Sequence, residues 1–255
     1  MSTLAVARIF FREAIRDRIL NLIWLFALAM LGLSLFMGDL SAGGELKVVK
    51  DLGLGVINLL LVLVAIMIGS NSIHKEIDKR TVYVVLSKPI SRWQFLLGKF
   101  LGLLGVIALL AAAMGVAFYL LLGLISPKDV EPIYVSALAL MVLEAAVISA
   151  LAILFSAITS PTLTAIYVLG VYLVGHNTET MLTFGSRGEA PEYVRIIGRV
   201  LYHVLPNLET LNIKNQVVYG HGIGMLEAAW ASAYAIGMVA VFLTLATFAF
   251  TTREI

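Results

Sequence analysis

The residues able to do chemistry in this chain gather in one charged segment, Ile73–Lys99, which lies between long apolar stretches. This segment holds six of the 18 lysines and arginines of the chain, namely Lys75, Lys79, Arg80, Lys88, Arg92 and Lys99. The charge of this segment indicates which side of a membrane it occupies, because basic loops between spans stay on the cytosolic side.

The order of residues within the segment predicts rigid elements rather than a simple turn. We expect His74–Ser87 to continue the preceding helix and then to form a short second helix. Pro89 ends that helix, because proline has no amide donor and restricts the residue before it. Ser91 lies three residues before Gln94, the spacing of a capping box, and this predicts a new helix from Arg92. A chain that only reversed direction would need about five residues.

Patterns typical of catalysis are missing from the sequence. It contains no GxxxxGK[ST] phosphate-binding loop, no HExxH, no GxSxG and no cysteine. Three of the four histidines, His176, His203 and His221, fall in one later polar region. They fit either a metal site or, more commonly, scattered surface positions. The sequence therefore predicts no catalytic, metal-binding or cofactor-binding residue in this chain.

Glu144 is the one ionisable residue well inside an apolar stretch. A carboxylate at the centre of a membrane span costs about 2.5–3.5 kcal/mol, so its presence calls for a reason. Two interpretations stay open: a polar contact on a transport path, or an interhelical hydrogen bond to Asn58 or a threonine. Asn58 also lies within an apolar stretch, where its amide needs a partner.

The composition places these residues in an all-α membrane protein, because 60% of the chain is hydrophobic and only 13% is charged. Residues 1–18 are predicted to form an amphipathic interfacial helix with Leu4, Ala7, Phe11, Ala14 and Ile15 on its apolar face. Arg8, Arg12 and Arg16 would contact lipid phosphates or form an ordinary basic flank. We predict six spans, at residues 19–37, 52–73, 95–124, 133–158, 162–175 and 226–250.

Lysine and arginine counts orient these spans. The residues before the first span, the charged segment and the tail carry most of the basic residues, and short loops dominate the rule, so both termini are predicted to be cytosolic. Residues 74–94 then form a cytosolic loop and 176–225 an outer region. Within that region Pro191–Leu205 is predicted to be an amphipathic helix that lies flat or re-enters the membrane. Gly98 and Gly102 have the small-xxx-small spacing of close helix packing.

The charged segment resembles the one between the second and third spans of ABC-2 type ABC transporter permeases. The resemblance rests on Glu76, on the run Thr81 to Leu86, on Ser87-Lys88-Pro89-Ile90-Ser91-Arg92 and on Gly98-Lys99. It extends over the whole chain, including the basic N-terminal helix, the six spans, the outer connection and the tail residues Arg253-Glu254. The chain looks most like short permeases that carry no fused ATPase.

The resemblance implies a coupling helix that docks into a separate dimer of ATP-binding subunits. Its docking residues would be Glu76, Lys79, Arg80, Thr81 and Tyr83, followed by a turn at Pro89, Ser91 and Arg92. ATP and magnesium would bind to that partner, and a second copy of the chain or a homologous permease would complete the transporter. We expect a bacterial or archaeal cytoplasmic membrane, lipid contacts, an accessory protein on the outer side as a further partner, and no nucleic acid. The alternatives are a membrane anchor or force transmitter without transport, or a membrane-embedded enzyme.

Overall fold

The structure is a computed structural model that describes residues 3–16, 45–74, 91–178, 192–218 and 224–252, with isolated positions between 21 and 32. Every regular element in these residues is helical, which confirms the all-α class. Four described helices are long and apolar enough to span a membrane: α3 (Glu45–Asn71), α6 (Arg92–Ile125), α7 (Ile133–Ile158) and α12 (Met225–Thr252). A shorter apolar helix, α8, covers Pro161–Gly175. The first predicted span, residues 19–37, lies largely outside the described residues, so the count of six stays a prediction.

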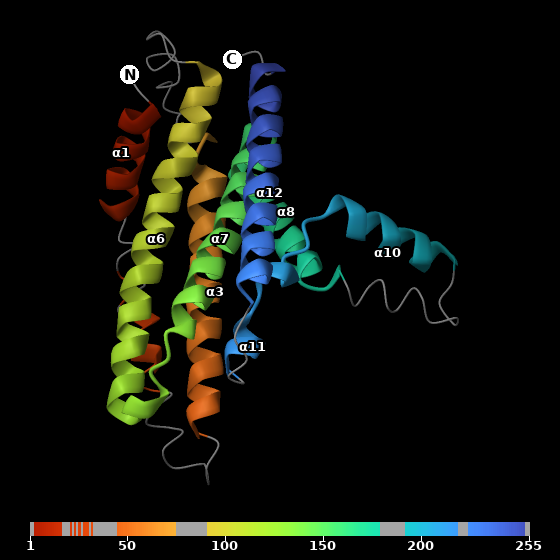
Figure 1. Cartoon of the computed structure of the whole chain (residues 1–255). Coiled ribbons are helices and arrows are strands. Elements are labelled where there is room, and N and C mark those ends of the chain that lie inside the picture. Colours follow the sequence, from red (N-terminus) through yellow and green to blue (C-terminus); the bar gives the residue numbers. More distant parts are fainter. Residues whose placement is uncertain are drawn as a thin grey trace.

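Helix α7 is the centre of the bundle. It packs against α12, α3, α6 and α8, and Figure 1 shows these helices side by side. Its residues from Glu144 to Ile153 are all buried, which follows from a sequence that is apolar on every face. Small side chains such as Ala146, Ala150 and Ala152 let the neighbouring helices approach closely. Any side chain that α7 points inward is therefore enclosed by the other helices.

The helix bounds follow the sequence closely in the second half of the chain but not at α3. Helix α7 has the predicted bounds, and α6 begins at Arg92 as predicted. The second span was predicted to begin at residue 52, whereas helix α3 already begins at Glu45. Hydropathy places a span where the charges stop, whereas a helix can extend past the hydrocarbon core with lysines in its first turns. Lys50 is buried there, with its Nζ 5.8 Å from the ring centroid of Tyr134.

The N-terminal helix α1 (Thr3–Ala14) packs along the first half of α6. A glycine stripe on α6 makes this possible: a Cβ at Gly98 would lie 2.7 Å from Val6 Cβ, and one at Gly102 would lie 2.8 Å from Ala7 O. The small-xxx-small spacing of Gly98 and Gly102 therefore marks a place where the backbones of α1 and α6 approach closely. The buried residues of α1 are Val6 and Ala14, whereas Leu4, from the predicted apolar face, is 73% exposed.

Arg8, Arg12 and Arg16 are exposed on α1 and immediately after it. Their predicted contacts with lipid phosphates stay a prediction.

Residues 176–225, which are predicted to form the outer region, contain α10 (Glu192–Val204), the 3-10 helix η3 (Glu209–Leu211) and the short helix α11 (Lys214–Val218). Figure 1 shows α10 projecting sideways from the bundle. Its apolar side chains Tyr193, Ile196, Val200 and Val204 are exposed. The predicted amphipathic helix is therefore present, but within one chain it does not cover the end of the bundle. Residues 206–213 return to the bundle and pack against the end of α8, as described below.

Candidate functional site

The charged segment is described only at its two ends, since residues 75–90 lie outside the described part of the chain. The predicted docking residues Glu76, Lys79, Arg80, Thr81 and Tyr83, and the turn residue Pro89, all fall within that gap. The two remaining turn residues, Ser91 and Arg92, are described. Both ends of the segment are anchored to the helix bundle by specific hydrogen bonds.

The downstream end begins with the predicted capping box. Ser91 is the N-cap of α6: its hydroxyl accepts the amide of Gln94 at 3.4 Å, and the Gln94 side chain accepts the amide of Ser91 at 3.3 Å. A cap of this kind stabilises a helix start by about 1 kcal/mol. The chain therefore leaves the charged segment directly into a well-defined helix.

Arg92 joins this helix start to the end of α12. Its Nη1 donates to the carbonyls of Phe250 at 2.7 Å and Thr251 at 3.1 Å. The guanidinium carbon lies 5.7 Å from the Phe250 ring centroid, and the same ring stacks on Phe95 at 6.1 Å. The last carbonyls of a helix have no partners within it and carry partial negative charge, so a guanidinium is well suited to cap them.

The upstream end of the segment, at the end of α3, is held by α7 and α6. The Ser156 hydroxyl on α7 donates to Ser70 O at 2.9 Å and accepts the amide of Ile73 at 3.4 Å. Lys99 on α6 is buried and donates to the carbonyl of Ser72. Its Nζ also lies 5.0 Å from the ring centroid of Phe95, which gives a cation–π contact. The two ends are thus tied to α3, α6, α7 and α12.

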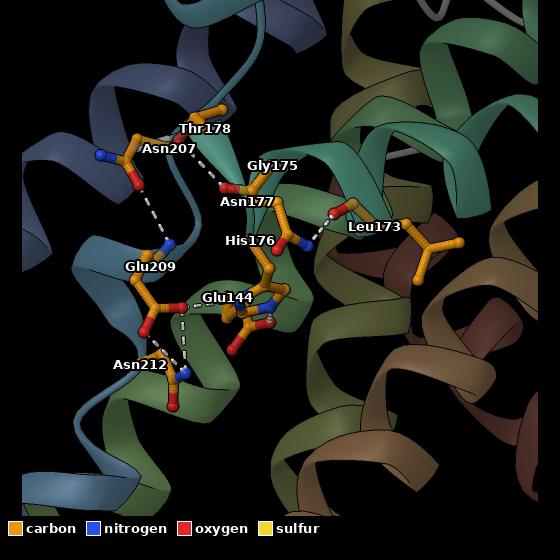
Figure 2. Close-up of polar contacts among 9 residues, drawn as sticks. All are labelled: Glu144, Leu173, Gly175, His176, Asn177, Thr178, Asn207, Glu209 and Asn212. Atoms are coloured by element: carbon orange, nitrogen blue, oxygen red, sulfur yellow. Dashed lines mark hydrogen bonds and ion pairs between the residues drawn. The ribbon is translucent and has the colours of Figure 1, made fainter. Parts of the chain in front are cut away.

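A second polar cluster surrounds Glu144, which is fully buried on α7. Its partner is His176, and not Asn58 or a threonine as the sequence suggested: His176 Nε2 lies 2.8 Å from Glu144 Oε1. The other ring nitrogen, Nδ1, lies 3.1 Å from Glu209 Oε2. Figure 2 shows the imidazole between the two carboxylates, with the Asn212 amide donating to Glu209.

The local sequence explains how these side chains meet. Helix α8 ends at Gly175, and His176 is its C-cap, with its amide donating to Tyr172 O. A Cβ at Gly175 would lie 2.8 Å from Pro206 O, so glycine is needed for the returning chain to approach. The amide of Leu208 then donates to Gly175 O at 3.2 Å, which sets η3 and Glu209 beside the histidine.

The environment of His176 favours its charged form. Burial lowers the pKa of the imidazole, but the hydrogen bonds and charges of Glu144 and Glu209 outweigh this, so the pKa is raised above its ordinary value. The two carboxylates lie on opposite sides of the ring, so the three groups do not converge on one point. Among the described residues, no group of three or more His, Cys, Asp or Glu side chains could hold a metal ion.

Several buried polar atoms have no hydrogen-bond partner within the described part of the chain. They include Glu144 Oε2, Asn212 Oδ1 and both side-chain polar atoms of Asn58. Asn58 is 1% exposed on α3, and its predicted need for a partner is not met by any described residue. Sequence reasoning missed His176 as the partner of Glu144, and it missed Glu209 and Asn212 as the next members of the cluster, because no spacing links residues that meet only through the fold.

These features define a polytopic helical membrane protein that has a polar cluster in its bundle and a charged segment anchored at both ends. The sequence model described as "ABC-2 family transporter protein" matches residues 4–255, nearly the whole chain. The chain therefore belongs to the ABC-2 family of transporters, whose permeases are membrane components that in general associate with an ATP-binding subunit. A comparison with curated proteins gives no match.

Proposed function

We propose that this chain is the permease subunit of an ABC-2 exporter that is driven by ATP hydrolysis in a separate subunit. Membership of the ABC-2 family supports the transport role. The lack of a phosphate-binding loop in the sequence supports a separate ATPase, which would hold ATP and magnesium. A second copy or a homologous permease completes the assembly, in a bacterial or archaeal cytoplasmic membrane with lipids and an accessory outer protein around it.

The anchoring of the charged segment is the observation that carries this proposal. A force applied to residues 75–90 can reach the spans only if the ends of the segment do not yield. One end is bound to Ser156 and Lys99, and the other is capped by Ser91 and tied by Arg92 to α12. Both termini and this segment face the cytosol in the proposed topology, where an ATPase can reach them.

Co-purification with an ATP-binding subunit tests the proposal. Glu76→Ala and Arg80→Glu should each weaken that association or abolish the stimulation of ATP hydrolysis, while membrane insertion survives because most of the positive charge remains. Lys128→Glu, a charge reversal in the turn between α6 and α7, serves as the matched control and should have no effect. Normal association and stimulation in both variants would refute docking at this segment.

Two further measurements separate the alternatives. A cysteine at Gly188 should be labelled from outside the cell, whereas one at Asp78 should not, and the reverse pattern would overturn the topology. Docking and ATP hydrolysis without movement of any substrate would instead indicate a force-transmitting or anchoring role.

A further inference from the structure

Three ionisable side chains form a line from the outer surface into the bundle. The exposed fraction of the side chain falls from 38% at Glu209 to 16% at His176 and 1% at Glu144. The two links in this line are hydrogen-bonding distances, 3.1 Å from Glu209 Oε2 to His176 Nδ1 and 2.8 Å from His176 Nε2 to Glu144 Oε1. The line therefore joins an accessible carboxylate to an enclosed one (Figure 2).

This geometry fixes the number of protons in the line. A neutral imidazole carries one N–H and one lone pair, and an ionised carboxylate only accepts hydrogen bonds. Both links can therefore form only if the ring is an imidazolium or if one of the two carboxyl groups carries a proton. In each case two protons occupy the two links and the net charge of the three groups is −1. Removal of one proton would set a lone pair of the ring against a carboxylate and break a link.

We propose that Glu209, His176 and Glu144 form a proton relay that loads the buried carboxylate of Glu144 from the outer region. In the step, protonated Glu209 gives its Oε2 proton to His176 Nδ1, while the Nε2 proton passes to Glu144 Oε1. The Oε2–H and Nε2–H bonds break, and the Nδ1–H and Oε1–H bonds form. The net charge stays at −1, and the outcome is that one proton has moved from the rim to Glu144.

The second oxygen of Glu144, Oε2, is buried with no hydrogen-bond partner in the described residues, and it lies among apolar helices where an ionised carboxylate costs free energy. The other groups that face the line are the Tyr172 ring, 4.8 Å from the imidazole centroid, and the Asn212 amide, which donates to both oxygens of Glu209. These two hydrogen bonds from Asn212 compensate the negative charge of Glu209 at the rim and not that of Glu144.

A proton fits this site better than a larger ligand. The Glu144 side chain is 1% exposed, so a metal ion or an organic cation could reach it only if the bundle opened. A proton needs only the two hydrogen bonds that the structure already contains. The relay therefore adds a proton-binding function to the chain, and this function does not depend on the proposed role of the charged segment.

Infrared spectroscopy of the purified full-length chain in lipid nanodiscs tests the relay. The carbonyl band of a protonated carboxylic acid should rise as the pH is lowered, and the part that belongs to Glu144 is identified by its loss in Glu144→Gln. On transfer to D₂O this band should shift rapidly in the unaltered chain. It should shift several-fold more slowly in Glu209→Gln, which cannot pass a proton from its side chain.

Two variants complete the experiment. Glu192→Gln removes another exposed carboxylate of the outer region and should exchange like the unaltered chain. His176→Gln breaks the line at its middle and should be as slow as Glu209→Gln, so the test does not depend on one variant folding. A spectrum with no band that depends on Glu144, or equal exchange rates in the unaltered chain and both relay variants, would overturn the proposal.

Discussion

Replacement of Arg92 by glutamine should loosen the end of α12 from the start of α6. The side chain makes two hydrogen bonds to the carbonyls of Phe250 and Thr251 and covers the Phe250 ring. A hydrogen bond from a charged group contributes about 1.5–3 kcal/mol when it is well shielded. Arg92 is half-buried and its two bonds share one nitrogen, so we expect a loss of about 1–2 kcal/mol.

Cysteine labelling measures this loss directly, because the chain contains no native cysteine. Ala246 on α12 is fully buried, so a single cysteine there reacts only when the helix end opens. A loss of one or two kcal/mol changes such a population by a factor of about 5–30, and the labelling rate of Ala246→Cys should rise accordingly in the Arg92→Gln background. Arg12→Gln, the same change at an exposed arginine of α1, is the control.

An unchanged labelling rate in Arg92→Gln would show that the contacts of Arg92 with the α12 carbonyls do not stabilise the packing of the α12 end. The downstream end of the charged segment would then be held only by the Ser91 cap of α6, and the anchoring argument for force transmission to α12 would fail. Arg92→Lys separates the causes further. It keeps the charge near the helix end but loses the planar stacking, so it should give an intermediate rate.

Three further outcomes are expected. Gly102→Ala should destabilise the α1 contact by about 1–3 kcal/mol in thermal unfolding, because its Cβ would lie 2.8 Å from Ala7 O, whereas Gly55→Ala meets nothing within 4 Å and should be neutral. Asn58→Leu should stabilise the chain by about 1 kcal/mol, since it removes a buried amide that has no hydrogen-bond partner among the described residues, and a loss of stability would reveal a partner outside them. Because the pKa of His176 is raised, its two hydrogen bonds stabilise the fold below about pH 6.5 and weaken as the pH rises through the raised pKa. Hydrogen exchange of the backbone amides in η3, corrected for its intrinsic rate, should accelerate over that pH range. In His176→Gln the corrected exchange rate should not change with pH.

Much of the scaffold could be predicted from the sequence because its signals are local. The capping box at Ser91 and Gln94 depends on residues three apart, and it placed the start of α6 at Arg92. Pro161 and the apolar run before Thr159 similarly marked where α7 ends and α8 begins. The start of α3 was missed, because its first turns carry charges that hydropathy assigns to a loop.

The polar contacts could not be predicted in the same way, since they join distant parts of the chain. Arg92 and Phe250 are separated by 158 positions, and no spacing rule relates them. Glu144 was recognised as costly, but its partner His176 was considered only as a metal ligand or a scattered surface residue, because the fold alone brings the two together. The glycine pair at Gly98 and Gly102 was a weak signal that acquires meaning only beside α1.

Helix α7 carries both polar sites, and this predicts that they influence each other. Ser156 holds the end of α3 beside the charged segment. Glu144 lies on the same helix, at a rise of about 18 Å along the axis from Ser156. Changes at sites this far apart without shared partners add to within about 0.3–0.5 kcal/mol. If the buried helix α7 moves as one rigid body, a change at one site also shifts the other, and the two effects no longer add. Ser156→Ala and Glu144→Gln should therefore have non-additive effects on the labelling of Ala246→Cys, and additive effects would show that α7 does not connect the two sites.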